Sequence, residues 1–286
     1  MSGSFSRRWS LGDSSHAEQS QDVQTVGDPP LQTPGDAASN YALGKNQGVQ
    51  ILTPVHYQHG YQYPLLVWLH SAGHNERQVE KVLPHISTRN YVSVGVRATK
   101  ATDVRGAGFD WTNSRNGVAK ASQSVFNAIE LAKETFSIHP ERVILAGFGS
   151  GATMACRVAM QNPESFAGVV RMAGQFPTAH GVVGDGIIEN FKALRQRRMP
   201  MLWQQAINGV DDDPDQLQLD IASAQNIQAQ VEIRQYRNED VMNTAALKDI
   251  DRWCFDKIFS PQPAEESTSL NLIRGADLKR VDFSSN

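Results

Sequence analysis

The stretch Arg142–Gln161 decides the fold, and it reads RVILAGFGSGATMACRVAMQ. Its first six residues form a mainly apolar run, which is typical of a strand buried on both faces of a sheet. Glycines stand at position 147, where this run ends, and at positions 149 and 151, and the remaining residues have the small and apolar side chains of a packed helix. The sequence therefore predicts a strand, a sharp glycine-rich turn and a helix in direct succession.

Strand-like and helix-like segments alternate on both sides of this stretch. The predicted strands are Tyr63–Leu69, Asn90–Val96, Arg142–Gly147, Phe166–Met172, Met199–Trp203 and Val231–Tyr236. The predicted helices are Glu76–Thr88, Ala119–Phe136, Ser150–Gln161, Ile187–Arg197, Gln216–Asn226 and Leu247–Phe259. Strands that alternate with helices of this length require crossover connections, so we expect one α/β domain over residues 41–260, with a mainly parallel central sheet and helices on both faces.

Two segments outside this domain differ in composition. Ser, Gly, Pro and Gln make up 19 of the first 40 residues, so residues 1–40 cannot bury enough apolar surface to offset their ordering entropy. We expect a disordered N-terminal tail there and a loose C-terminal tail over residues 261–286, in which Leu270, Leu272 and Ile273 could dock. The tails are candidate sites for protein partners.

Composition excludes several classes of function. The chain has 27 basic and 30 acidic residues, a formal charge of −3, which gives no electrostatic footprint for nucleic acid. No stretch approaches the 18 apolar residues of a membrane span, and no apolar run follows Arg7 and Arg8 to make a signal peptide, so we expect a cytoplasmic protein. Cys156 and Cys254 fit buried apolar positions, and we expect no metal or other cofactor.

A strand, a tight turn and a helix around the motif G-x-S-x-G form the nucleophile elbow of many hydrolases. With LHSAGHNE at residues 69–76, the chain resembles the α/β-hydrolase superfamily, nearest its carboxylesterase, phospholipase and acyl-protein thioesterase branch. That branch would read roughly LHGxGGNE and AGFSxGG at these two places. The resemblance covers most of residues 48–259 and implies the α/β-hydrolase fold.

The resemblance places Gly149 where the nucleophilic serine belongs. Gly147 and Gly151 then occupy the two small positions, and a glycine at 149 adopts the strained positive φ of the elbow at little cost. The rival frame makes Ser150 the nucleophile, but it puts Phe148 and Ala152 at the small positions. We therefore favour Ser150 as the first residue or cap of the helix.

The catalytic histidine of the family belongs after the strand Val231–Tyr236, and the sequence has no histidine beyond His180. Asp240, with Glu239 beside it, stands near the vacant position, but a carboxylate accepts a serine proton poorly at neutral pH unless its pKa is strongly raised. His180 follows an earlier strand and would require an unusual triad. The degenerate triad thus lacks a base.

The resemblance implies that other parts of the family site are partly kept, although the Asp-Asp-Asp-Pro run at residues 211–214 is also typical of a solvated acidic loop. Gly209 and Asp212 resemble the G-x-x-D of the catalytic acid, with Asp211 and Asp213 equally plausible. The resemblance makes the backbone N–H groups of Ala72 and Ser150 the two oxyanion-hole donors.

Two further side chains are candidates for ligand binding. His70 either contacts a ligand or is a hydrogen-bonded histidine at a strand end, and we favour the latter. Trp111 either walls a pocket or plugs it.

We conclude from the sequence that the chain is a carboxylesterase- or phospholipase-like protein that has lost catalysis. It would act as a binding or scaffolding protein, with a cleft for a small acyl or carboxylate ligand. The alternative is a weak carboxylesterase or thioesterase that uses Ser150 with a non-standard base such as His180. A third possibility is an interaction module in which the tails carry the function.

Overall fold

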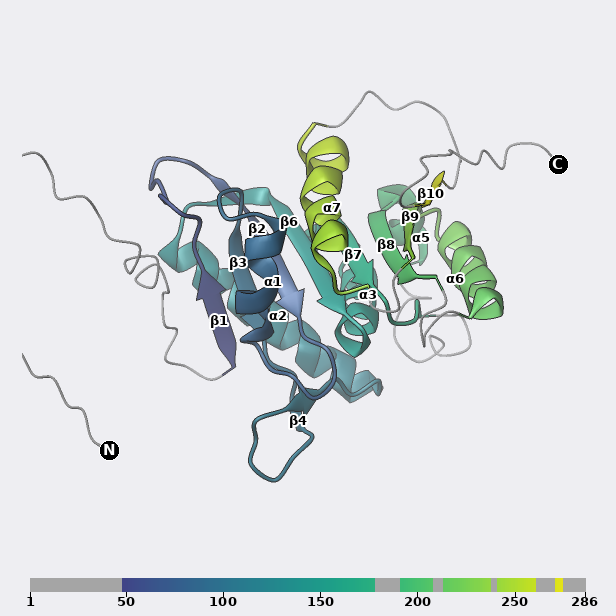
Figure 1. Cartoon of the computed structure of the whole chain (residues 1–286), viewed down its shortest axis with the longest axis horizontal. Coiled ribbons are helices and arrows are strands. Elements are labelled where there is room, and N and C mark those ends of the chain that lie inside the picture. Colours follow the sequence, from purple (N-terminus) through teal and green to yellow (C-terminus); the bar gives the residue numbers. More distant parts are fainter. Residues whose placement is uncertain (1–47, 178–190, 208–212, 238–240, 261–270, 275–286) are drawn as a thin grey trace, which may run out of the picture. The chain divides into compact units, whose positions relative to one another are not determined.

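A computed structural model of the chain describes residues 48–177, 191–207, 213–237, 241–260 and 271–274 (Figure 1). Contacts group Ala37–Asn286 into one unit, and every described residue belongs to it. Residues 1–47, which include the predicted N-terminal tail, lie outside the described part.

The described strands form an eight-stranded sheet and a separate two-stranded ribbon. The sheet runs in the order β1-β3-β2-β6-β7-β8-β9-β10, and every neighbouring pair is parallel except β1 with β3. Its strands are β1 (Val49–Leu52), β2 (Tyr63–Leu69), β3 (Val92–Val96), β6 (Ile138–Phe148), β7 (Gly168–Met172), β8 (Pro200–Ala206), β9 (Gln230–Tyr236) and β10 (Asn271–Arg274). The ribbon pairs β4 (Lys100–Ala101) with β5 (Phe109–Asp110).

Helices cover both faces of the sheet. The described helices are α1 (Gln78–Ile86), α2 (Arg115–Thr135), α3 (Ser150–Gln161), α5 (Phe191–Arg197), α6 (Pro214–Asn226) and α7 (Thr244–Trp253), with short turns at Pro163–Ser165 and Cys254–Phe259. Apolar side chains of α1 and α7 share one core cluster, and these two helices lie side by side in Figure 1. Apolar side chains of α2, α3, α5 and α6 belong to the other cluster. The predicted α/β-hydrolase architecture, a mainly parallel sheet between helices, is confirmed.

The two clusters follow from the alternation of side chains along each strand. In β2, Leu65, Val67 and Leu69 face one cluster, while Leu66 and Trp68 face the other. Because all seven residues of β2 are buried, the strand reads as the continuous apolar run YPLLVWL.

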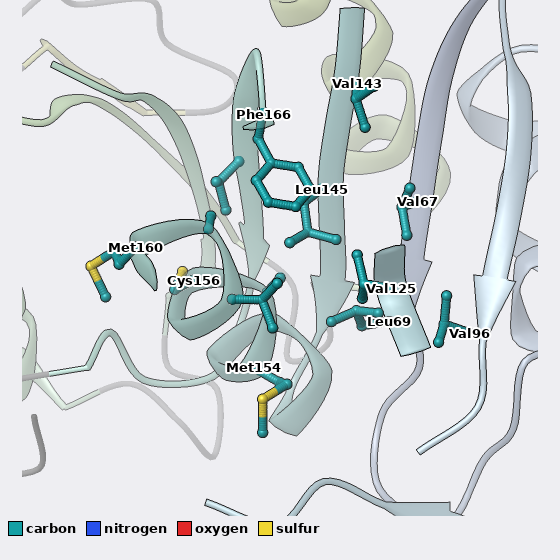
Figure 2. Close-up of a cluster of buried hydrophobic side chains, with 14 of the residues drawn as sticks. Val67, Leu69, Val96, Val125, Val143, Leu145, Met154, Cys156, Met160 and Phe166 are labelled. Atoms are coloured by element: carbon teal, nitrogen blue, oxygen red, sulfur yellow. The ribbon is translucent and has the colours of Figure 1, made fainter. Parts of the chain in front are cut away.

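Figure 2 shows the cluster between the sheet and α3 at close range. Side chains of β2 and β6, such as Val67 and Leu145, extend toward the side chains that α3 contributes, Met154 and Cys156. Cys156 and Cys254 are both free and buried, as the sequence predicts. This packing fixes the end of β6 against the start of α3, which is where the site lies.

Most predicted elements agree with the structure, although some bounds differ: β6 and α2, for example, each begin four residues earlier than predicted. β2 and α3 have the predicted bounds, whereas α7 begins three residues before the predicted Leu247 and gives way to a wider π-helical turn at Cys254. β1 was not predicted, because four residues carry little periodicity. β10 lies in the segment assigned to the C-terminal tail and pairs in parallel with β9. Among the described helices, none is long and apolar enough to cross a membrane.

Candidate functional site

Gly149 forms a sharp elbow between β6 and α3. Its backbone has φ 56° and ψ −121°, a strained combination that glycine tolerates far better than other residues. Its N–H donates to the carbonyl oxygen of Met172 at 3.0 Å, and its own carbonyl oxygen accepts from the N–H of Ala152 at 3.0 Å and of Thr153 at 3.2 Å. These bonds hold the strained turn at the end of β6, with residue 149 between strand and helix.

Two neighbouring glycines allow the strand and the helix to approach each other. A Cβ on Gly147 would lie 2.6 Å from the carbonyl carbon and oxygen of Gly151, and a Cβ on Gly151 would lie 2.2 Å from the carbonyl oxygen of Leu69. A Cβ on Gly149, by contrast, would meet only the Cβ of Ser71, at an ordinary 3.7 Å. Positions 147 and 151 are therefore the small positions of the elbow, and position 149 is the one with room for a side chain.

The turn after β2 lies against this elbow and carries one of the predicted backbone donors. Ala72 is exposed at its tip, and Gly73 adopts a positive φ of 76°. Ser71, which replaces the family glycine, is buried: Gln78 Nε2 donates to Ser71 Oγ at 3.0 Å, and His74 Nδ1 lies 3.1 Å from the same oxygen. The serine is thus accommodated by side-chain partners that the sequence analysis did not identify.

Ser150 is the first residue of α3, and its hydroxyl points to a carboxylate. Ser150 Oγ donates to Asp110 Oδ1 at 2.8 Å. Asp110 Oδ1 also accepts from the N–H of Trp111 at 2.8 Å. Within the described residues, the Ser150 hydroxyl contacts no histidine; His180, the alternative base, lies outside them. The first N–H groups of a helix have no intrahelical acceptor, so the N–H of Ser150 remains a donor at the elbow.

The comparison with protein families agrees with this geometry. Residues 55–187 match the model of the phospholipase/carboxylesterase family. Over these residues the chain is similar to that family, and its fold is the α/β-hydrolase fold. Among curated proteins, none matches the chain.

Several solved structures share the α/β-hydrolase fold of the chain. SOBER1 of Arabidopsis thaliana has a TM-score of 0.53 at 18% identity, and the match covers 67% of this chain and 97% of SOBER1. A carboxylesterase of Bacillus cereus has a TM-score of 0.53 at 11% identity, with 72% and 92% covered. An acylaminoacyl peptidase of Pyrococcus horikoshii has a TM-score of 0.55 at 15% identity, with 76% and 40% covered. At these identities the likeness shows the fold alone.

His70 is a structural residue in this α/β-hydrolase-fold protein, although it was a candidate for ligand binding. Its side chain is fully buried, its Nε2 accepts from the N–H of Ala98 at 3.0 Å, and its Nδ1 lies 2.8 Å from the carbonyl oxygen of Ser71. The proton is therefore on Nδ1 and donates to that carbonyl. Burial lowers the pKa of His70, which keeps the ring neutral and unavailable to a ligand.

Trp111 is also packed inside, so it does not form the exposed wall of a pocket. Its side chain is 6% exposed, and its Nε1 donates to the carbonyl oxygen of His70 at 2.7 Å. The indole and imidazole rings lie 5.3 Å apart, centroid to centroid. Trp111 therefore anchors β5, and with it Asp110, to the end of β2.

The acid and base positions lie mostly outside the described residues. Asp212, its alternative Asp211, Gly209, Asp240 and Glu239 all fall there. The third candidate acid, Asp213, is described, and its side chain accepts from the N–H of Asp215 at 3.0 Å and of Gln216 at 3.2 Å. Asp213 is thus the N-cap of α6, a structural role that Asp and Pro at the start of a helix often indicate.

The described residues include no group of three or more His, Cys, Asp or Glu side chains that could hold a metal ion. The polar groups that the structure brings together beside the elbow are the Ser150 hydroxyl and the Asp110 carboxylate, next to the two backbone N–H groups that the resemblance predicts as donors.

Proposed function

We propose that this α/β-hydrolase-fold protein has lost serine-hydrolase catalysis and acts as a binding or scaffolding protein with a cleft for a small acyl ligand. The observation that carries the proposal is Gly149, which has the backbone conformation of a nucleophile elbow and no side-chain oxygen. The sequence adds that no histidine follows His180, so the family base is missing as well.

Loss of the nucleophile and the histidine should reduce the rate of hydrolysis greatly. Removing the nucleophile or the histidine of a triad reduces the rate by several orders of magnitude and leaves about a 10³-fold advantage over water, from the oxyanion hole and from binding. The Ser150 hydroxyl does not replace the nucleophile easily, because its partner is the carboxylate of Asp110. A carboxylate is a weak acceptor for a serine proton at neutral pH. We therefore expect no efficient ester hydrolysis.

The features that remain support binding. The N–H groups of Ala72 and Ser150 are the donors that the family would direct at a carbonyl or carboxylate oxygen, and such donors bind an acceptor whether or not a nucleophile is present. The missing side chain at position 149 leaves room, because a Cβ there would meet only Ser71 Cβ within 4 Å. A small acyl group could occupy this space.

Two assays test the proposal together. The first measures hydrolysis of p-nitrophenyl butyrate by the wild-type protein and by Ser150→Ala, and we expect no turnover above the buffer in either. The second follows the backbone amides of Ala72 and Ser150 by NMR while an acyl ligand such as methyl hexanoate is added, and we expect both signals to shift. Turnover that Ser150→Ala abolishes would overturn the loss of catalysis; the absence of any shift would overturn the binding cleft.

We also propose that the protein works in the cytoplasm and contacts protein partners through residues 1–40 or 261–286. The composition of residues 1–40, rich in Ser, Gly, Pro and Gln, supports a role in recognition for that segment. Deleting residues 1–40 would reduce recovery of bound partners if the segment carries this role, and unchanged recovery would refute it.

A further inference from the structure

We propose that Asp110 makes the cleft beside Gly149 selective for a carboxamide and unfavourable for a carboxylate. The inference rests on the proposed binding function and names the chemical class of the ligand. It starts from a charged group that the sequence analysis did not assign to the site: the carboxylate that accepts the Ser150 hydroxyl at 2.8 Å.

The position of Asp110 is fixed relative to both backbone donors. Phe109, the residue before it, forms two backbone hydrogen bonds with the turn that carries Ala72. The N–H of Phe109 donates to the carbonyl oxygen of His74 at 2.8 Å, and the N–H of Gly73 donates to the carbonyl oxygen of Phe109 at 3.0 Å. The Ser150 hydroxyl ties the carboxylate to the start of α3. Asp110 is therefore held next to the two residues whose N–H groups would donate to a ligand oxygen.

One oxygen of this carboxylate is available to a ligand. Oδ1 is used by Ser150 Oγ and by the N–H of Trp111. Oδ2 accepts from no donor in the described part of the chain, and no ion pair there involves Asp110. Beside the two expected backbone donors there is thus a carboxylate oxygen that no described residue occupies.

A carboxamide matches this arrangement. Its carbonyl oxygen can accept from the N–H groups of Ala72 and Ser150, while its own N–H can donate to Asp110 Oδ2 in a charge-assisted hydrogen bond. A carboxylate ligand has no hydrogen to donate, and its charge is repelled by Asp110 at short range. An ester can accept a hydrogen bond but has no N–H to donate and no charge, so its affinity should lie between those of the carboxamide and the carboxylate.

The test compares hexanamide with hexanoate at pH 7, using the NMR shifts of the Ala72 and Ser150 amides to measure each dissociation constant. We expect hexanamide to bind about tenfold more tightly than hexanoate, as one close charge repulsion in a partly exposed site implies. In Asp110→Asn we expect the ratio to fall to about two, chiefly through tighter binding of hexanoate. Asp256→Asn, which removes the same charge from an exposed position on the turn after α7, should leave the ratio unchanged.

The outcomes separate the inference from the proposed function. Equal or tighter binding of hexanoate by the wild-type protein, or an unchanged ratio in Asp110→Asn, would overturn the inference while leaving an acyl-binding cleft intact. If neither compound shifts the two amides, the binding cleft and the inference both fail. The wild-type ratio needs no variant, so the test stands even if Asp110→Asn does not fold.

Discussion

Two glycines of the elbow, Gly149 and Gly151, should respond differently to alanine, because each is required for a different reason. We predict that Gly151→Ala destabilises the protein most, Gly149→Ala by an intermediate amount, and Gly60→Ala hardly at all. Gly60 is the control: a Cβ there would meet no atom within 4 Å, and its φ is not in the left-handed region.

The magnitudes follow from the contacts of the added Cβ. At Gly151 it would lie 2.2 Å from the carbonyl oxygen of Leu69 and 2.4 Å from that of His70, both backbone atoms that cannot rotate away, so α3 and β2 would have to separate. Such overpacking costs about 3 kcal/mol or more. At Gly149 the contact with Ser71 Cβ is an ordinary 3.7 Å, and the cost is the strain of a φ of 56° and ψ of −121°, about 2 kcal/mol.

Thermal unfolding followed by circular dichroism measures these differences. For a domain of this size, about 1 kcal/mol corresponds to a change in Tm of about 2–4 °C, so we expect a loss of about 4–8 °C for Gly149→Ala and more than about 6–12 °C for Gly151→Ala. Equal losses for the two variants, or a Gly151→Ala protein as stable as Gly60→Ala, would refute the assignment of position 149 as the elbow position with room for a side chain.

Three further predictions concern buried polar groups of the domain. Asp220→Ala leaves the fully buried guanidinium of Arg171 without the carboxylate that lies 2.5 Å from it. The free energy of unfolding, measured by urea titration, should therefore fall by about 3–5 kcal/mol. A loss below about 1 kcal/mol would show that the ion pair is dispensable. Trp111→Phe removes the donor to the buried carbonyl of His70 and should cost about 1–3 kcal/mol in the same assay, whereas an unchanged midpoint would contradict the anchoring role. Burial lowers the pKa of His70, so the unfolded chain binds the proton more readily than the folded one. The contribution of His70 to stability is therefore complete above its unfolded pKa of about 6.5 and is lost as the pH falls from there toward the lower folded pKa, with a slope of at most about 1.4 kcal/mol per pH unit. His70→Gln should abolish this part of the pH dependence, and the same slope in that variant would assign it to another group.

The fold could be predicted because its main signals are local. A strand buried on both faces, such as β2, is apolar along its whole length, and the small and apolar residues of α3 follow directly from a glycine turn. β1 and the two-residue strands β4 and β5 could not be predicted in the same way, since they are too short to show periodicity and depend on their partners. β10 depends in the same way on the exposed edge of β9.

The candidate site could be predicted only in part. The register of the elbow follows from the spacing of Gly147, Gly149 and Gly151, because close approach of a strand and a helix requires small residues at fixed positions. The bond between Ser150 and Asp110 joins residues 40 positions apart, and nothing in the sequence indicates that β5 returns Asp110 to the start of α3. The sequence shows which residues could react, whereas long-range contacts decide what each of them faces.

The loss of the nucleophile is the central claim, and covalent labelling tests it most directly because it needs no turnover. The wild-type protein is incubated with a fluorophosphonate, which forms a stable adduct with an activated serine, and its intact mass is measured beside that of an active serine esterase and of Ser150→Ala. We predict that the protein remains unlabelled while the esterase is labelled completely. A stoichiometric adduct that maps to Ser150, or to Ser71 beside the elbow, would show that a nucleophile survives and would contradict the account.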